Sequence, residues 1–214
     1  MCGLSKAEPH IFHTLTMNQR PETLFSNSAN LPTKYGSFNV VSFKEKGSSN
    51  EHLVLTMGDV WHKEKVLTRV HSECLTGDVF TSLKCDCGEQ LEASMRMISE
   101  KKEGIIIYLK QEGRGIGLFN KINAYALQDQ GQDTIQSNHS LGFETDLRTF
   151  EIVSEVIEFL EVQSLNLLTN NPDKIEAVIN ATQKQSTTQP LKIKPNRHNN
   201  KYLDVKKRKL MHLL

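Results

Sequence analysis

Three of the four cysteines in this chain of 214 residues lie close together, in the stretch RVHSECLTGDVFTSLKCDC from Arg69 to Cys87. The C-x10-C-x-C spacing allows Cys74 to stand on a strand and to meet Cys85 and Cys87 after a turn through residues 76–78. Three thiolates suit zinc, and catalytic zinc sites use three protein ligands and keep the fourth position open. Three buried core cysteines are the alternative. The acidic residue between the last two cysteines favours the metal site.

The charges nearly balance, with 26 Lys and Arg against 25 Asp and Glu, and the mean hydropathy is −0.44. No apolar run approaches the length of a membrane span, and the first residues lack a basic segment followed by an apolar one. Neither a transmembrane helix nor a signal peptide is therefore predicted. Cysteines that stay free to bind metal suit a reducing compartment. We expect a cytoplasmic protein with no membrane partner.

Apolar residues alternate or run together at several places in the first half of the chain, which predicts strands. The segment between the first two strands, residues 44–51, is polar and predicts a hairpin loop. A continuous apolar run after residue 104 is typical of a strand buried on both faces. The predicted strands cover residues 38–43, 53–57, 66–70, 105–109 and 165–168.

Helical periodicity appears after the cysteines, and it predicts helices over residues 91–98, 118–126 and 152–160, with a further helix that Asn171 caps and Pro172 begins. The predicted fold is α/β, with a mixed sheet, a β-rich N-terminal half and helices packed on the sheet. We expect three parts. They are a loosely ordered extension over residues 1–28, a main domain over 29–180, and a linker with a basic tail over 181–214.

Two loops between a strand and a helix are candidates for phosphate binding. In the first, Glu112, Gly113 and Arg114 follow a strand, and backbone N–H groups at the start of a helix favour an anion. A tight turn without a ligand would explain the glycines about as well. In the second, Thr169 and Lys174 flank the start of a helix, although Lys174 could equally be a solvated charge.

The C-terminal stretch from Leu191 holds eight Lys and Arg against the single acid Asp204. Such a segment could bind nucleic acid or close over a polyanionic substrate. A solvated tail is the alternative, although Tyr202, Leu203 and Leu210 suggest that part of it docks as a helix.

Several motifs, in order, resemble the GTP cyclohydrolase II family, the enzymes that open riboflavin biosynthesis. They are RVHSECLTGD, SLKCDCGEQLEASM, YLKQEGRGIGLFNKINAYALQ, NHSLGFETDLRTF and LLTNNPDK, which together span about residues 31–174. The resemblance implies one catalytic zinc ion per subunit on Cys74, Cys85 and Cys87, with Mg2+ on the triphosphate. It also implies conversion of GTP to formate, pyrophosphate and 2,5-diamino-6-(5-phosphoribosylamino)pyrimidin-4-one by a homodimer.

The resemblance also assigns residues. Tyr125 would exchange a proton during ring opening, Asp146 would be a proton acceptor, and Arg148 would be the nucleophile toward the α-phosphate. Because a guanidinium is almost always protonated, stabilising phosphate charge is the easier task for Arg148. By the same resemblance, the residues around GTP are Arg69, Val70, His71, Ser72, Glu73, Gln90, Glu112, Gly113, Arg114, Thr134, Thr169 and Lys174.

Two other functions remain open at this level. One is a related GTP cyclohydrolase that feeds another pathway. The other is a zinc-stabilised module that binds nucleic acid through the basic tail, which leaves the pairs Glu112/Arg114 and Asp146/Arg148 unexplained. We therefore expect GTP and a second subunit as partners, and no nucleic acid. The chain departs from the family pattern in ATQKQSTTQPL and at Met211, where a glycine is usual.

Overall fold

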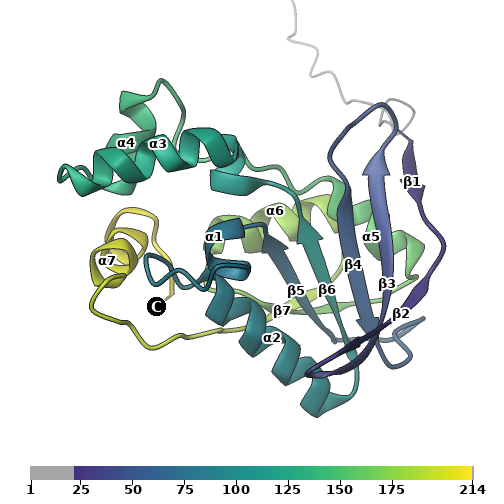
Figure 1. The fold of residues 1–214 in the computed structure, drawn as a ribbon. Helices are drawn as coiled ribbons and strands as arrows, with labels where there is room; N and C mark the ends of the chain where they lie inside the picture. The colour runs from purple at the N-terminus through teal and green to yellow at the C-terminus, as the bar shows by residue number, and fades with distance from the viewer. Residues whose placement is uncertain (1–21, 214) are drawn as a thin grey trace, which may run out of the picture.

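The computed structural model describes residues 22–213 of the chain, and its centre is one eight-stranded sheet in the order β1-β3-β4-β6-β5-β7-β8, with β2 paired to β3 (Figure 1). The strands are β1 (Thr23–Phe25), β2 (Ala29–Thr33), β3 (Gly36–Glu45), β4 (His52–Met57), β5 (Val66–Ser72), β6 (Gly104–Leu109), β7 (Leu165–Leu168) and β8 (Ser186–Gln189). The helices are α1 (Leu75–Asp78), α2 (Cys87–Lys101), the 3-10 turn η2 (Glu112–Gly115), α3 (Gly117–Asp129), α4 (Thr134–Ser140), α5 (Ile152–Phe159), α6 (Pro172–Thr182) and α7 (Asn200–Lys209).

The sheet is antiparallel in its first half and parallel in its second. Strands β1, β3, β4 and β6 pair antiparallel, whereas β6, β5, β7 and β8 pair parallel. β5 and β6 are buried along almost their whole length, as expected for parallel strands that are covered on both faces. Alternate residues of β6 face opposite sides, so that Ile105 and Ile107 enter one core and Ile106 enters another.

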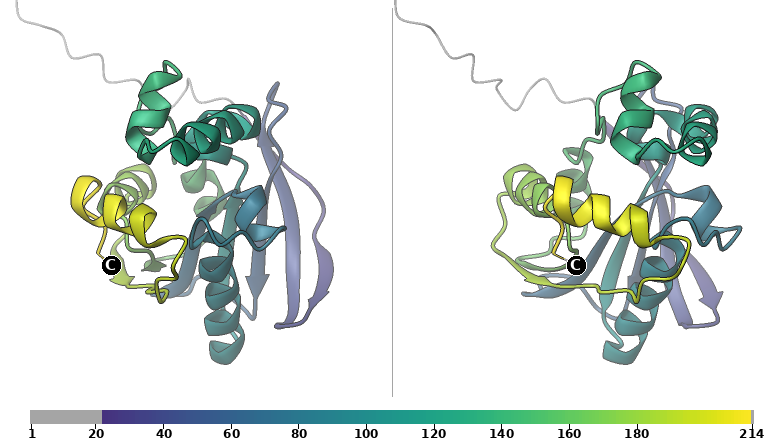
Figure 2. Two further views of the ribbon diagram at one scale, coloured as in Figure 1. Left: turned by 60° about the vertical axis from the view of Figure 1, so that its left-hand side comes forward. Right: turned by 90° about the vertical axis from the view of Figure 1, so that its left-hand side faces the viewer.

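Helices cover both faces of the sheet. One core packs α5 and α6 against the strands through residues such as Val156, Ile157 and Val178, and the other packs α2 through Ile98 (Figure 1). The carboxyl ends of the parallel strands β5, β6 and β7 meet at one edge, where open α/β sheets commonly bind ligands. α7 lies across this end, between the α3–α4 pair and the strands, and faces the viewer in the right-hand view of Figure 2.

The predicted fold class is confirmed, and so are the predicted strands and helices of the main domain. Several local expectations need correction. β5 ends at Ser72, so Cys74 precedes the short helix α1 and does not lie on a strand. α4 lies over Thr134–Ser140, where no helix was predicted. Strands β1 and β8 lie where loose segments were expected, and β2 lies where no strand was predicted.

Strands β1 and β8 lie at the two edges of the sheet, where each pairs with only one neighbour among the described strands. The four residues of β8, STTQ, pair parallel with β7, and β1 pairs with the end of β3. Most of the expected extension, residues 1–21, lies outside the described residues, and the domain boundaries at residues 28 and 180 stay predictions. Over the described part of the chain, no helix is both long and apolar enough to span a membrane.

Candidate metal and substrate site

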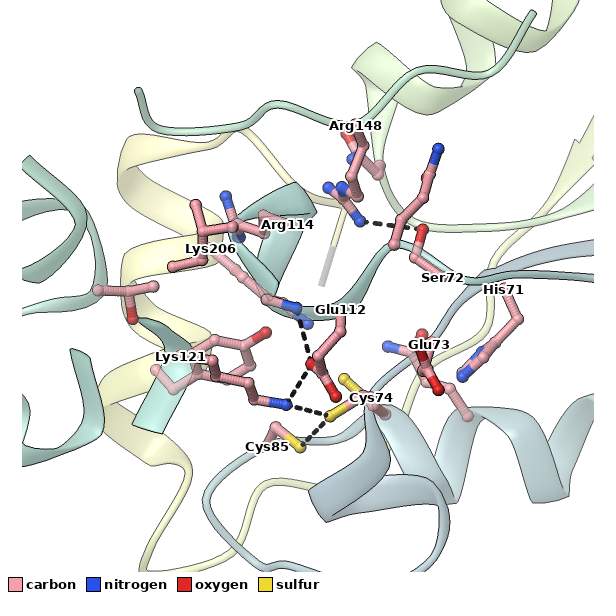
Figure 3. Close-up of a pocket in the computed structure, with 18 of the residues that line it drawn as sticks. His71, Ser72, Glu73, Cys74, Cys85, Glu112, Arg114, Lys121, Arg148 and Lys206 are labelled. Carbon is pink, nitrogen blue, oxygen red and sulfur yellow. Dashed lines mark hydrogen bonds and ion pairs between the residues drawn. The ribbon is translucent and has the colours of Figure 1, made fainter. Parts of the chain in front are cut away.

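A pocket lies at the carboxyl ends of β5, β6 and β7. Its volume is about 1080 Å³ when the open space at its mouth is included. Figure 3 shows Cys74 and Cys85 on one side of this pocket and Arg148 on the other. Side chains from α3, α4 and α7 complete the lining.

The three cysteines meet at the start of α2. Their sulfur atoms all lie within 4.8 Å of one another, and the Sγ atoms of Cys74 and Cys85 are 3.6 Å apart. Two glycines allow this approach, because a Cβ on Gly88 would collide with the carbonyl oxygen of Gly77 and a Cβ on Gly77 would lie 3.0 Å from Cys85 Sγ. The Gly77–Gly88 contact thus brings α1 against α2 and closes the cysteine trio.

The trio fits a soft divalent cation. Thiolates on a tetrahedral zinc ion stand about 3.8 Å apart, since each Zn–S bond is about 2.3 Å, and the observed separation of 3.6 Å agrees. The hydrogen bond from Cys85 lowers the pKa of the Cys74 thiol, while the same bond raises the pKa of Cys85 to about 11. A bound cation would stabilise all three groups as thiolates. This cysteine group could hold a metal ion.

A carboxylate behind the trio fixes its first member. Asp78 accepts hydrogen bonds from the backbone N–H of Cys74 at 3.0 Å and from the hydroxyl of Tyr108 at 2.8 Å. His71 Nε2 lies 3.1 Å from both carboxylate oxygens of Asp78. Burial lowers the pKa of His71, so this ring is neutral at pH 7 and donates its Nε2–H to the carboxylate. Such groups commonly orient the ligands of a metal.

Lys121 and Glu112 tie α3 to the trio. Lys121 Nζ donates to Glu112 Oε1 at 2.7 Å and to Cys74 Sγ at 3.1 Å (Figure 3). The other oxygen of Glu112 accepts the backbone N–H of Leu75 at 2.6 Å, and Oε1 also accepts that of Gly113 at 2.7 Å. The Glu112 carboxylate is thus fully used inside the protein, and the charge of Lys121 offsets that of the thiolate.

The opposite side of the pocket carries an arginine–aspartate pair. Arg148 donates from Nε to Asp146 Oδ1 at 2.8 Å and from Nη2 to Asp146 Oδ2 at 2.5 Å. Although burial lowers it, the bond to Asp146 leaves the pKa of Arg148 above its ordinary value, so Arg148 is a cation. The loop that carries the pair is held by a hydrogen bond from Leu147 N to Arg114 O at 3.0 Å. A Cβ on Gly115, whose φ is +91°, would lie 2.9 Å from Leu147.

Further cations surround this pair. Arg114 Nη1 lies 3.9 Å from Asp146, and Lys174 Nζ donates to the carbonyl oxygen of Val70 at 3.0 Å. Burial, together with the charges of Arg148 and Arg69, lowers the pKa of Lys174 well below its ordinary value. Cations that repel one another in a buried site are the environment in which a polyanion binds well.

The predicted site residues come together in this pocket with two exceptions. The side chain of Val70 packs in the core between the sheet and α5, and only its carbonyl oxygen reaches Lys174. Asp146 lines a neighbouring hollow and reaches the pocket through Arg148. All the other predicted residues line the pocket: Arg69, His71, Ser72, Glu73, Cys74, Cys85, Cys87, Gln90, Glu112, Gly113, Arg114, Tyr125, Thr134, Arg148, Thr169 and Lys174.

The sequence interpretation missed several pocket residues. Lys121 stands four residues before Tyr125, and this helical spacing places both on one face of α3, so the pattern did contain the signal. Tyr202, Lys206 and His212 also line the pocket, and they come from the C-terminal segment. The basic character of that segment gave no sign of which side chains turn inward.

The chain is similar to known proteins along most of its length. A family model described as GTP cyclohydrolase II matches residues 25–182. A GTP cyclohydrolase-2 of Campylobacter hominis is 54% identical over 189 residues, which cover 88% of this chain and 94% of that protein. A GTP cyclohydrolase-2 of Haemophilus influenzae is 49% identical over 187 residues, or 87% of each chain. The riboflavin biosynthesis protein RibBA of Endomicrobium trichonymphae is 42% identical over 216 residues, which cover 97% of this chain and 54% of that protein.

The match to this family identifies an enzyme of the hydrolase class. The chain belongs to the GTP cyclohydrolase II family.

Proposed function

We propose that this chain hydrolyses GTP to 2,5-diamino-6-(5-phosphoribosylamino)pyrimidin-4-one, formate and pyrophosphate, as the first step of riboflavin biosynthesis. Zinc on Cys74, Cys85 and Cys87 and Mg2+ on the triphosphate belong to this proposal. One observation carries it: a single pocket joins a group of three thiols to a cluster of buried cations. Opening a guanine ring and releasing pyrophosphate need those two environments within the length of one nucleotide.

The metal serves the guanine end. When bound, zinc supplies the Lewis acidity that activates water at neutral pH and polarises the carbonyl group released as formate. The protein holds the ring beside it and excludes competing water. Glu73 lines the pocket, and no hydrogen bond to its carboxylate occurs among the described residues, unlike the fully used Glu112. Glu73 is therefore the carboxylate free to accept the N–H donors of guanine.

Tyr125 is placed to give a proton during ring opening. Its hydroxyl lies 3.4 Å from Thr76 Oγ1, and Lys121 Nζ lies 5.6 Å from its ring centre. Burial raises the pKa of Tyr125 to about 12, so the phenol keeps its proton at pH 7. Tyr125 therefore acts as a donor to the opening ring before it can accept a proton in return.

At the other end, Arg148 stabilises charge on the phosphate that is attacked. Its two hydrogen bonds to Asp146 keep the guanidinium protonated, and a protonated guanidinium has no lone pair for nucleophilic attack. Asp146 orients Arg148 and can accept a proton from an attacking water, while Arg114 and Lys174 bind further phosphate oxygens. This assignment favours a stabilising role for Arg148 over that of nucleophile.

The proposal extends to a cytoplasmic homodimer. Free thiols that bind metal need a reducing compartment. Exposed aromatic side chains such as Phe80 and Phe119 offer apolar surface that a second subunit could cover. Size-exclusion chromatography with light scattering tests the dimer.

Incubation of zinc-loaded protein with GTP and Mg2+ tests the function, with formate, pyrophosphate and the pyrimidine assayed together. We expect the three products in equal amounts. A different pyrimidine product would indicate a related cyclohydrolase for another pathway. If GTP is not consumed, the proposal fails.

A further inference from the structure

The C-terminal segment forms part of the pocket, yet the reaction proposed above gives it no role. We propose that Lys206 on α7 is a positioning residue for the nucleotide, because its buried ion pair with Asp86 fixes the orientation of Gln90 and Arg69. The proposal rests on GTP as the substrate. If Lys206 has this role, the C-terminal segment is required for nucleotide binding.

The ion pair is deeply buried. Lys206 Nζ lies 2.6 Å from Asp86 Oδ1, and the two side chains are 8% and 1% exposed. The ring of Tyr202, one helical turn earlier, lies 4.5 Å from the same ammonium group. Asp86 stands between Cys85 and Cys87, so this bond joins α7 to the loop that carries the thiols. Loss of one partner would leave an uncompensated charge in the interior.

A chain of hydrogen bonds continues from Asp86 into the pocket. Gln90 Nε2 donates to Asp86 Oδ2 at 2.5 Å, and Gln90 Oε1 accepts from Arg69 Nη2 at 2.6 Å. These two bonds fix which end of the Gln90 amide faces which partner. Gln90 and Arg69 both line the pocket. Lys206 thus controls two pocket side chains without needing to touch the nucleotide.

The segment is attached at two further places beside the pocket. Near its end, Leu213 N donates to Asn170 O at 2.8 Å, and the side chain of Asn170 makes two hydrogen bonds to the backbone of Leu191. On α7 itself, Lys209 Nζ lies 2.6 Å from Asp133, the residue that caps α4 just before Thr134. These attachments join the C-terminal segment to α4 and to the β7–α6 loop. The segment is therefore docked on the protein and is not a solvated tail.

The charge of Lys206 distinguishes its role from that of the phosphate-binding cations. Lys206 faces a carboxylate at 2.6 Å, whereas Lys174 faces a carbonyl oxygen and other cations. Removal of Lys206 therefore leaves the phosphate cluster intact and frees Asp86 and Gln90 to move. We expect weaker nucleotide binding, with the chemical step less affected.

The experiment compares Lys206→Met with Lys207→Met, a matched substitution at an exposed position on the same helix. KM and kcat for GTP are measured, together with the Kd of a GTP analogue that has a methylene group between the α and β phosphorus atoms and cannot lose pyrophosphate. For Lys206→Met we expect KM and Kd to rise roughly 10- to 100-fold, as is typical when a residue behind a ligand-binding side chain is lost. We expect kcat to fall less than tenfold, and Lys207→Met to match the unchanged protein.

Two further variants keep the test decisive. Lys206→Arg retains the charge and should recover part of the affinity, and it replaces Lys206→Met if that variant does not fold. The double variant Lys206→Met/Asp86→Asn should bind the GTP analogue no more weakly than whichever single variant has the higher Kd. The two substitutions break the same chain of hydrogen bonds, so their effects should not add. Additive losses would overturn the proposal, and so would a lower melting temperature for Lys206→Met with KM and Kd unchanged.

The analogue separates this proposal from the proposed function. If the unchanged protein binds the analogue but does not turn over GTP, the function fails while the Kd comparison still tests Lys206. If it does not bind the analogue, the positioning role is overturned as well.

Discussion

The two ends of the pocket are built in different ways. The thiol end comes mainly from one stretch of chain, in which β5, α1 and the start of α2 follow one another within residues 66–88. The cation end gathers Arg114, Arg148 and Lys174 from three separate loops and helices. A soft metal needs a few ligands at fixed distances, which a short segment can supply. A polyanion needs many donors spread over a larger volume, which several segments supply together.

The thiol end and the cation end of the pocket can therefore lose their function separately. Close glycines and the Asp78 carboxylate support the thiol end, whereas loop contacts such as Leu147 N to Arg114 O support the cation end. α7 is attached to the thiol end through Asp86, and His212, in the segment that follows α7, also lines the pocket. A substitution in this C-terminal segment could therefore disturb both the thiol end and the cation end of the pocket.

The largest expected effect follows the loss of one thiol. Cys85→Ser should lose zinc and lower the rate of formate release roughly a thousandfold or more, because several kcal/mol of Lewis-acid stabilisation are lost at about 1.4 kcal/mol for each factor of ten. Zinc content and a formate assay measure this. Cys2→Ser is the control, since Cys2 is not part of the trio. An unchanged rate of formate release by Cys85→Ser would contradict the claim that the thiol end is needed to open the ring.

At the cation end, Arg148→Lys should lower pyrophosphate release on the order of 100- to 1,000-fold, because lysine cannot keep both hydrogen bonds to Asp146 while it stabilises phosphate charge. Zinc content should not change. Arg96→Lys, on the exposed surface of α2, is the control. Because a nucleophilic Arg148 would fail equally, isolation of a phosphorylated enzyme is the observation that would contradict the stabilising role.

A smaller effect is expected behind the trio. Asp78→Asn removes the negative charge that accepts from Cys74 N, Tyr108 and His71. Zinc affinity should fall roughly 10- to 100-fold, as is common for residues that orient metal ligands. Competition with a chromogenic chelator measures this. The exposed Asp129→Asn provides the same chemical change as a control. An unchanged zinc affinity would show that Asp78 is not needed to orient Cys74.

The smallest effect concerns pH and the C-terminal segment. Burial, with the charges of Lys206, Arg114 and Arg148, lowers the pKa of His212 to about 3, below the unfolded value of about 6.5. The unfolded chain therefore binds more protons between these values, and stability is lost as the pH falls below about 6.5. The loss is at most about 1.4 kcal/mol per pH unit, and less because solvent screens a partly exposed group.

Urea unfolding between pH 5 and 7 tests this expectation. The unchanged protein should lose stability toward pH 5 more steeply than His212→Gln, and the difference between the two slopes isolates this ring from the other histidines. Parallel slopes would show that His212 takes no part in the docking of the segment.

Most strands and helices and the group of three thiols were predictable from sequence because their signals are local. Apolar runs mark both β4 and β6, and the cysteine spacing predicts the group of three thiols even though Cys74 does not lie on a strand. The edge strand β8 was missed because edge pairing uses backbone groups and leaves little pattern in STTQ. The Lys206–Asp86 pair joins residues 120 positions apart, and no local pattern predicts it.

One measurement tests most directly whether the two ends work separately. Zinc is removed from the protein with a thiol-containing chelator, Mg2+ is kept in excess, and formate and pyrophosphate are assayed from the same incubation with GTP. We predict that formate release stops, that pyrophosphate release continues, and that added zinc restores formate. Loss of both products together, or formate release without zinc, would contradict the division of the pocket into a metal end and a phosphate end.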